Sequence, residues 1–271
     1  MDELDRYLEE DIGKVGDITS DALFKDEKAR AKIFVKEKCV IAGTEEVKQL
    51  FEKLDTNIFF KKKDGEFVKE KTDIAEISGP VRSILKGERL ALNILGRMSG
   101  IATETRKLVD ICKKINPNIK IASTRKTTPG FRKYEKKAVV IGGGETHRQG
   151  LYDAVMIKDN HIKLKGSIEE SIKSVKQKIK DKTIEVEVEN EKDAIIASNL
   201  GVDIIMLDNF DPLSAEKVSK KIREINNKIL IEISGGININ NITKYAAFAD
   251  RISLGYLTHS IKNIDFSLEI I

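Results

Sequence analysis

The sequence predicts an α/β protein in which a mixed N-terminal part precedes a barrel of parallel strands. After about residue 116, at least six short apolar runs alternate with amphipathic helices, and repeats of this kind build parallel sheets. Before that point the segments are mixed and partly antiparallel. No GxGxxG motif follows the first strand of the repeats, so a closed or partly open barrel accommodates them better than a doubly wound dinucleotide-binding sheet.

Length and composition suit an ordinary soluble protein. The chain has 271 residues, 40% hydrophobic and 34% charged, which allows one large or two modest domains. Its 48 Lys and Arg nearly balance 44 Asp and Glu, and the net charge of +4 argues against a bulk nucleic-acid binder. No apolar run approaches the ~18–20 residues of a membrane span, and the acidic start is unlike a signal or transit peptide. Because Cys39 and Cys112 belong to no CxxC motif, we expect a cytoplasmic protein with reduced thiols.

The N-terminal part opens with a helix and a strand. Glu3–Glu10 is amphipathic and predicts a short helix, and Ala31–Lys36 alternates as a strand does. We expect a second helix over Glu45–Leu54, capped by Thr44. Two glutamates occupy its first turn, where the helix dipole favours acidic side chains.

A hairpin and a further strand complete the sheet expected here. Asp64-Gly65 is a strong signal for a two-residue turn, and it predicts that Asn57–Lys63 pairs with Glu66–Lys69. Thr72–Ser78 alternates again and ends at Gly79-Pro80.

A long helical stretch follows, from about Val81 to Ile115. Glycine weakens a helix interior by about 1 kcal/mol relative to alanine. We therefore expect this stretch to be broken near Gly87 and near Ser99-Gly100.

The barrel elements come next. Ser167–Lys180 begins with the capping box Ser167-Ile-Glu-Glu170, and Leu213–Ile225 is a second amphipathic helix. The strand-like runs are Ile119–Ala122, Ala154–Ile157, Ile184–Val188, Ile204–Leu207, Ile229–Ile233 and Ile252–Leu254. In such barrels the active site lies at the C-terminal ends of the strands, and a phosphate site often lies in the last two βα loops.

Two glycine-containing loops occupy the expected phosphate position. Ser234-Gly235-Gly236 directly follows the run Ile229–Ile233, and Gly255 directly follows Ile252–Leu254. Glycine lets backbone N–H groups approach phosphate oxygens. Glycine after a strand also serves in ordinary turns, so both interpretations stay open here.

Basic side chains gather in three segments at consecutive predicted strand ends. The segments are 123–132, 142–148 and 156–161, and the cations that they can aim into one pocket are Arg125, Lys126, His147, Arg148 and Lys158. Arginine grips a carboxylate with two hydrogen bonds and lysine adds a mobile charge. The pattern therefore favours a pocket for a small, multiply anionic ligand over a set of solvated charges.

The three histidines show no HxH or HExxH spacing, so a zinc site is not expected. His147, beside Arg148, is interpreted as a hydrogen-bond donor to an anion. His161 is expected to order its own loop, and His259 to be structural.

Carboxylates follow the next two strands. Glu185, Glu187 and Glu189 alternate and should share one strand face, and Asp208 ends the following run. Mg²⁺ takes one or two carboxylates together with substrate phosphates; an exposed acidic edge is the alternative. Cationic pocket, carboxylate pair and glycine loops together predict a Mg²⁺-dependent transferase or lyase for small anions.

These motifs resemble the quinolinate phosphoribosyltransferase family, also called nicotinate-nucleotide pyrophosphorylase (carboxylating). The resemblance runs nearly end to end, and the ordered series is far more specific than any one motif. The segments that carry it are Glu10–Thr19, Gly87–Asn93, Ser99–Thr103, Thr124–Gly130, Gly142–Arg148, Lys158–His161, Glu185–Glu187, Leu207–Asn209, Ser234–Ile237 and Gly255–Ser260.

The resemblance implies the two domains of a type II phosphoribosyltransferase-like fold. Residues 1–103 would form an N-terminal α/β sandwich domain and residues 104–261 an open, irregular α/β barrel. The tail 262–271 would return to the sandwich. Arg89 is expected to reach into the site of a neighbouring subunit, which makes the active unit at least a homodimer.

The same resemblance implies a reaction in NAD biosynthesis. Quinolinate and 5-phosphoribosyl 1-diphosphate would give nicotinate mononucleotide, diphosphate and CO₂, with Mg²⁺ and no organic cofactor. By motif, Arg125, Lys126, His147, Arg148 and Lys158 would hold quinolinate, Thr124 would touch substrate, Glu187 and Asp208 would serve Mg²⁺ directly or indirectly, and Ser234, Gly235, Gly236 and Gly255 would bind the 5-phosphate. Lys126, Lys158, Glu187 and Asp208 would be the catalytic residues.

Two rival interpretations remain. A relative with the same fold could use another acceptor, and the cations available for two carboxylates favour quinolinate against it. A non-catalytic anion-binding or sensor protein is the second rival, but it has no use for Glu187 and Asp208 beside the basic pocket. Neither nucleic acid nor a membrane is an expected partner.

Overall fold

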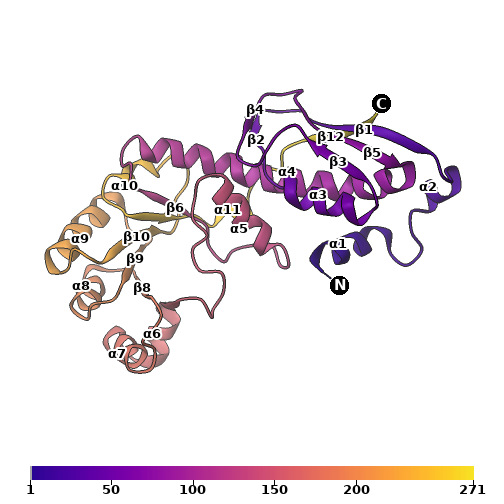
Figure 1. The fold of residues 1–271 in the computed structure, drawn as a ribbon. Helices are drawn as coiled ribbons and strands as arrows, with labels where there is room; N and C mark the ends of the chain where they lie inside the picture. The colour runs from indigo at the N-terminus through magenta and orange to yellow at the C-terminus, as the bar shows by residue number, and fades with distance from the viewer. Residues whose placement is uncertain (1) are drawn as a thin grey trace. The chain divides into compact units, whose positions relative to one another are not determined.

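The computed structural model describes residues 2–271, which divide into two compact units (Figure 1). The first unit comprises residues 2–106, 133–142 and 260–271, and the second comprises residues 107–132 and 143–259. The segment 133–142 thus joins the first unit, although it lies within the range 104–261 that the sequence assigned to the barrel. No helix within residues 2–271 combines the length and apolar character that crossing a membrane requires.

A four-stranded antiparallel sheet forms the centre of the first unit, in the order β12-β1-β5-β3. Its strands are β1 (Lys28–Val35), β3 (Asn57–Phe60), β5 (Asp73–Pro80) and β12 (Phe266–Ile270). Alternation along β1 buries Ala31, Ile33 and Val35 on one face. β12 pairs with β1 from Ala31↔Ile270 to Val35↔Phe266, so residues near the C-terminus complete a sheet begun near the N-terminus.

The helices of the first unit agree in part with the sequence-based predictions. They are α1 (Glu3–Ile12), α2 (Ile18–Leu23), α3 (Thr44–Lys53), α5 (Arg132–Ile141) and the greater part of α4 (Val81–Lys113). The predicted first helix and first strand are confirmed. α1 starts with a capping box between Asp2 and Asp5, which satisfies backbone N–H groups that would otherwise have no acceptor.

The expected breaks in the long helix are wrong, because α4 is one continuous helix of 33 residues. Its glycines permit close packing. A Cβ on Gly87 would lie 2.7 Å from Cε1 of Phe51, and one on Gly100 would collide with the backbone carbonyl oxygen of Lys262. Burial against neighbouring elements therefore outweighs the weak intrinsic helix propensity of glycine.

The predicted hairpin at Asp64-Gly65 is also wrong. The tight turn forms, since the backbone N–H of Glu66 donates to the carbonyl of Lys63 at 3.1 Å. The strands beyond it separate: β3 pairs with β5, whereas β4 (Phe67–Val68) pairs with β2 (Cys39–Val40). Gly65 donates instead to the carbonyl of Ile41 at 2.8 Å, which ties the turn to the β2 side.

The cap predicted for α3 is wrong for a related reason. Thr44 is the first residue of the helix, and Gly43 precedes it in a left-handed conformation with φ of 102° and without a side-chain cap. The backbone N–H of Thr44 donates to Oδ1 of Asp64 at 3.0 Å. A carboxylate distant in sequence therefore satisfies the helix terminus that the local pattern assigned to a threonine hydroxyl.

A six-stranded parallel sheet forms the second unit, in the order β6-β11-β10-β9-β8-β7. The strands are β6 (Lys120–Ala122), β7 (Val155–Ile157), β8 (Ile184–Val188), β9 (Ile204–Asp208), β10 (Leu230–Ser234) and β11 (Arg251–Ser253). All six predicted barrel strands are confirmed. Among the residues that the structure describes, β6 and β7 form no ladder with one another, so the barrel is open.

The second unit also contains helices between and after these strands. They are α6 (Asp159–Lys165), α7 (Ile168–Lys178), α8 (Glu191–Asn199), α9 (Pro212–Ile225), α10 (Thr243–Ala246) and α11 (Tyr256–His259). Figure 1 shows α7, α8 and α9 following one another along one side of the strands. The predicted helices at Ser167 and Leu213 are confirmed, and the Ser167 side chain caps α7 by accepting from the N–H of Glu170 at 3.2 Å.

The two faces of the parallel sheet differ in chemistry. Val186, Leu207 and Ile231 belong to the apolar core that packs under the helices. The alternating positions on the opposite face include Glu185 and Glu232, both buried. The interior of the open barrel is therefore charged, which is unusual for a packed barrel centre.

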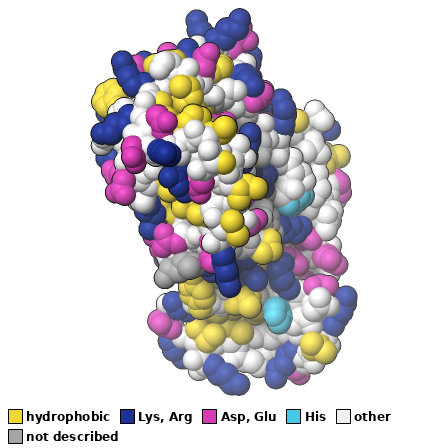
Figure 2. Space-filling view, turned by 90° about the vertical axis from the view of Figure 1, so that its right-hand side faces the viewer, with side chains coloured by type: hydrophobic (Ala, Val, Ile, Leu, Met, Phe, Trp, Pro, Cys, Tyr) yellow, Lys and Arg dark blue, Asp and Glu magenta, His cyan; other side chains and the backbone are white. Residues whose placement is uncertain are grey.

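The surface carries charges of both signs. On the face shown in Figure 2, Lys and Arg side chains are interspersed with Asp and Glu, in keeping with the small net charge of +4.

We expect Gly100→Ala to destabilise the chain even though alanine is the better helix former. The new Cβ meets a backbone oxygen of Lys262, which cannot move without disturbing the path toward β12, and overpacking of this kind costs about 1–3 kcal/mol. Gly87→Ala should cost less, because its Cβ meets only side-chain atoms. Urea unfolding of both variants checks this, and a Gly100→Ala protein as stable as the wild type would contradict it.

Candidate active site

A cavity of about 720 Å³ lies at the C-terminal ends of the barrel strands, a volume suited to a small-molecule site. Twelve of the thirteen predicted site residues line it: Thr124, Arg125, Lys126, His147, Arg148, Lys158, Glu187, Asp208, Ser234, Gly235, Gly236 and Gly255. The thirteenth, Arg89, is exposed on α4 and is not among the lining residues. The topology thus brings three separate basic segments and two carboxylates to one cavity.

Two guanidinium groups are crowded together on one side of this cavity. Burial and the nearby charge of Arg125 lower the pKa of Arg148 from its ordinary value. The Nε of Arg125 is shielded from solvent and has no hydrogen-bond partner within residues 2–271. Like charges held this close repel, so this side of the cavity favours an anion with more than one carboxylate.

The loop that carries Lys126 is held by backbone contacts. The N–H of Lys126 donates to Oγ1 of Thr124 at 3.1 Å. Its carbonyl accepts a hydrogen bond from Oγ1 of Thr258 at 2.7 Å, and Thr258 is fully buried in α11. The start of the last short helix therefore fixes the backbone from which Lys126 extends.

Lys158 stands at the start of α6 and pairs with Glu187 of β8. The backbone N–H of Lys158 donates to Nδ1 of His161 at 3.0 Å. His161 itself does not line the cavity. His161 therefore contacts the backbone of its own loop, whereas the ammonium group of Lys158 faces the candidate site.

The carboxylates form the opposite side of the cavity. Burial and the charge of Glu187 raise the pKa of Asp208. One oxygen of Asp208 accepts from Nδ2 of Asn209 at 2.7 Å. The amide donor and two neighbouring lysines neutralise the negative charge of the carboxylate pair only in part. Carboxylate oxygens are preferred ligands of Mg²⁺, so the pair suits this cation. Glu185 lies deeper in the barrel and Glu189 is exposed, so the three glutamates of β8 have different surroundings.

The glycine loop after β10 needs its glycines. Gly235 and Gly236 have φ of 83° and 61°, a left-handed region that other residues rarely adopt. A Cβ on Gly235 would lie 2.6 Å from the backbone N of Asn209, whereas one on Gly236 would meet open space. The loop therefore packs directly against the loop that carries Asp208 and keeps its second glycine open toward the cavity.

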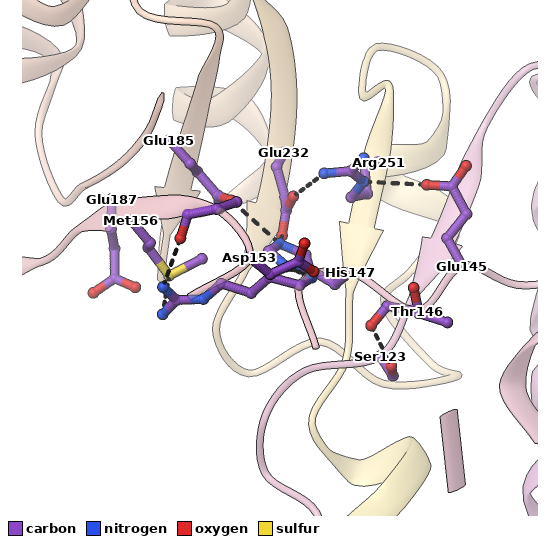
Figure 3. Close-up of polar contacts among 12 residues, drawn as sticks. Ser123, Glu145, Thr146, His147, Asp153, Met156, Glu185, Glu187, Glu232 and Arg251 are labelled. Atoms are coloured by element: carbon purple, nitrogen blue, oxygen red, sulfur yellow. Dashed lines mark hydrogen bonds and ion pairs between the residues drawn. The ribbon is translucent and has the colours of Figure 1, made fainter. Parts of the chain in front are cut away.

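His147 is placed differently from its predicted role as a donor to an anion. Its Nε2 lies 3.3 Å from Oε2 of Glu185 and 3.2 Å from Oε1 of Glu232. Its Nδ1 accepts the backbone N–H of Arg148 at 2.7 Å. Figure 3 shows the ring between the glutamates of β8 and β10. Nδ1 is therefore taken by the backbone, whereas Nε2 faces two carboxylates at ion-pair distance and has no hydrogen bond of good geometry within residues 2–271.

Buried charges continue beyond His147. Arg251 donates from Nη1 to Oε2 of Glu232 at 3.1 Å, and its Nε lies 3.4 Å from Oε2 of Glu145 (Figure 3). Glu232 and Arg251 were missed by the sequence analysis. Their signal was available: Glu232 shares the strand face of Ser234, because side chains two residues apart point the same way.

This network sets the protonation of its members. Burial alone would lower the pKa of His147, but Glu185 and Glu232 outweigh it and raise the pKa to about 9. Burial would likewise raise the pKa of Glu232, but His147 and Arg251 hold it below its ordinary value. His147 is thus an imidazolium at neutral pH, paired with at least one carboxylate.

We expect the stability contributed by His147 to fall as the pH rises. A histidine whose pKa is 6.5 unfolded and about 9 folded contributes fully below pH 6.5, and the contribution, up to about 3 kcal/mol, is lost as the pH rises to 9. The measurement is urea unfolding of the wild type and of His147→Gln between pH 6 and 9.5. The difference between the two proteins should shrink toward high pH; a constant difference would contradict the assignment.

Comparison with known proteins identifies relatives over the whole chain. The family model "Quinolinate phosphoribosyl transferase, C-terminal domain" matches residues 101–269, and its N-terminal counterpart matches residues 17–99. A probable nicotinate-nucleotide pyrophosphorylase [carboxylating] of Archaeoglobus fulgidus is 46% identical over 94% of this chain and 98% of its own. A similarly named protein of Bacillus subtilis is 42% identical over 98% of this chain and 92% of its own.

Solved structures agree with these matches. The nicotinate-nucleotide pyrophosphorylase from Francisella tularensis has a TM-score of 0.92 at 37% identity, covering 99% of this chain and 94% of that one. These matches and the fold lead to one conclusion: the chain belongs to the quinolinate phosphoribosyltransferase family.

Proposed function

We propose that the chain is a nicotinate-nucleotide pyrophosphorylase (carboxylating). It transfers the phosphoribosyl group of 5-phosphoribosyl 1-diphosphate to quinolinate, and releases nicotinate mononucleotide, diphosphate and CO₂ in NAD biosynthesis. The observation that carries this is the meeting of paired arginines, paired carboxylates and a glycine loop in one cavity. The names of the relatives support the same reaction.

Quinolinate occupies the cationic side in this proposal. Its two adjacent carboxylates match the two crowded guanidiniums of Arg125 and Arg148, since each arginine presents a planar pair of donors. Thr124, Lys126 and Lys158 complete the surroundings of the acid. His147 contributes through the placement of its neighbour Arg148.

The diphosphate and ribose occupy the acidic side. Glu187 and Asp208 would hold Mg²⁺, because their partly neutralised carboxylates fit its ligand preference. When bound there, Mg²⁺ would offset negative charge on the diphosphate. Lys126 and Lys158 add positive charge from the protein, and the pairing of Lys158 with Glu187 keeps its ammonium at the boundary between the two substrates.

The 5-phosphate lies against the glycine loops. Ser234, Gly235, Gly236 and Gly255 line the end of the cavity formed by β10 and β11. Backbone N–H groups in left-handed glycine turns form concave anion sites. This arrangement fixes one end of the sugar and leaves its anomeric carbon toward the acid.

The chemistry then needs no organic cofactor. As the diphosphate leaves, positive charge develops on the ribose, and the carboxylates of Glu187 and Asp208 would stabilise it. The pyridine nitrogen of quinolinate bonds to the anomeric carbon. The C–C bond to the adjacent carboxylate then breaks: CO₂ leaves, the electron pair of that bond stays on the ring carbon beside the positive nitrogen, and a proton from water bonds to that carbon in place of the carboxylate.

The functional unit in this proposal is a cytoplasmic homodimer or a larger homo-oligomer, without nucleic acid or membrane as a partner. Arg89 is exposed and is not a lining residue of the cavity in its own chain. It would enter the site of a second copy and add a further cation for quinolinate.

The purified protein tests the proposed reaction. With quinolinate, 5-phosphoribosyl 1-diphosphate and Mg²⁺ it should form nicotinate mononucleotide, and a chelator should lower the rate at least about tenfold because the carboxylate pair then lacks its cation. Nicotinate should not replace quinolinate, since it offers one carboxylate to two arginines. Chromatography of the products gives the answer. Turnover of another acceptor alone, or Mg²⁺-independent binding without turnover, would replace this proposal with one of its rivals.

Co-expressed variants test the shared site. Arg89→Ala and Lys158→Ala should each be nearly inactive alone, whereas a hybrid dimer of the two retains one of its two sites intact and should recover about half of wild-type activity. The matched control is Lys158→Ala with Glu187→Ala, two residues of one cavity, which should recover nothing. Activity of the purified hybrids measures both. No recovery in the first pair would contradict the role of Arg89.

A further inference from the structure

The proposed reaction leaves a set of buried charges unused. Glu185 is 2% exposed and Glu232 is fully buried, and both lie inside the barrel beneath the cavity. Neither lines the cavity. A buried carboxylate is costly unless it is paired, so the fold retains these residues against a considerable desolvation penalty.

The position of the two buried glutamates in the barrel indicates which side chain they hold in place. β6 and β7, the edges of the open barrel, are not paired. Segment 145–148 borders β6: Glu145 forms an isolated parallel bridge with Ala122, and the N–H of Ser123 donates to the carbonyl of Glu145 at 3.0 Å. From this border the side chain of His147 enters the barrel interior and meets the glutamates.

The backbone at this point is strained. His147 has a φ of 54°, a left-handed conformation that a non-glycine residue adopts only where its surroundings hold it. The ring is fixed on one side by the carboxylates and on the other by the N–H of Arg148. The conformation sends the side chain of His147 inward and that of the next residue, Arg148, toward the cavity.

The guanidinium of Arg148 contacts the strand that follows. Nη1 lies 3.4 Å from the carbonyl of Ala154, and Nη2 lies 3.3 Å from Sδ of Met156. Because the side chain extends from the turn at 147–148, a change in that turn would move the guanidinium relative to these contacts.

The second oxygen of Glu232 is fixed as well. Arg251 donates to it at 3.1 Å and is itself 3.4 Å from Glu145, whose other oxygen lies 3.3 Å from Lys120. The chain of contacts thus links the inner end of His147 to three strands of the barrel, β10, β11 and β6.

We propose that Glu232, held by Arg251, is a positioning residue that anchors His147 and thereby aims Arg148 at quinolinate. Glu232 touches no substrate and acts through the turn at 147–148. The inference rests on the proposed function, because it assigns the aimed arginine to the quinolinate half of the site.

The selective effect follows from the geometry. Removing the charge of Glu232 leaves the imidazolium of His147 with Glu185 alone, and releases the left-handed turn. A displacement of about 1 Å at a binding group can cost up to a hundredfold, so we expect Glu232→Gln to raise the KM for quinolinate about tenfold or more. The KM for 5-phosphoribosyl 1-diphosphate should change less than about twofold, because the glycine loops and Asp208 do not depend on His147.

A matched control separates positioning from general damage. Glu135 is another fully buried carboxylate paired with an arginine: Nη2 of Arg97 donates to it at 2.7 Å in the first unit. Glu135→Gln should lower stability without changing the ratio of the two KM values. Arg148→Ala supplies the reference for complete loss of the aimed group.

A conservative pair extends the test should Glu232→Gln fail to fold. Arg251→Lys keeps a cation beside Glu232 and should retain most of the wild-type affinity for quinolinate, whereas Arg251→Gln should weaken it. Calorimetric titration with quinolinate alone measures this without turnover.

The outcomes are distinct. A selective rise in the KM for quinolinate in Glu232→Gln, with Glu135→Gln unchanged, supports the proposal. Equal changes for both substrates, or none, overturn it. A wild-type protein that forms no nicotinate mononucleotide would instead contradict the proposed function itself.

Discussion

The open barrel is the constraint on which the second unit depends. Because β6 and β7 do not pair, the interior is not sealed by a continuous ladder, and segment 145–148 borders the gap at β6. The interior it meets is charged, with Glu185 and Glu232 against His147 and Arg251. Such a network is stable only when every member has a partner of opposite charge. The same segment continues to the lining of the cavity. Residues that border the open edge of the barrel therefore also form part of the candidate site.

Electrostatics divides the cavity above this interior into two halves. Arg125 and Arg148 crowd one half, and Glu187 with Asp208 occupies the other. Lys158 pairs with Glu187 and lies between them. Within each half, side chains of like charge repel one another unless a ligand of opposite charge is bound. In the proposed reaction quinolinate would meet the cationic half directly, and the anionic diphosphate would meet the acidic half through Mg²⁺.

The sequence predicted the parts of this molecule that depend on local pattern. The six barrel strands follow from apolar periodicity, the cap at Ser167 from its capping-box motif, and most of the residues that meet in the cavity from the rule that parallel strands end at one edge. Thr124, and the choice of Glu187 among the three glutamates of its strand, came from the family resemblance. The predictions from sequence were wrong where a residue distant in the chain determines the local structure. The glycines of α4 looked like breaks because Lys262 lies far away in sequence, and the turn at Asp64 looked like a hairpin because its partner Thr44 precedes it by twenty residues. Glu232 was overlooked inside an apolar run, since periodicity assigns a face but not its chemistry.

The pairing of β12 with β1 bears on the order of events during synthesis. Val35 meets Phe266 in this ladder, so the sheet of the first unit lacks this edge strand until residues 266–270 have been synthesised. Pairing across such a separation is slow, because a long loop must close first. The second unit, built from consecutive β/α repeats, has mostly local partners and can form while the exposed edge of β1 waits. A nascent chain of this protein should therefore be most prone to aggregate through β1, in the interval between completion of the barrel and arrival of its last strand.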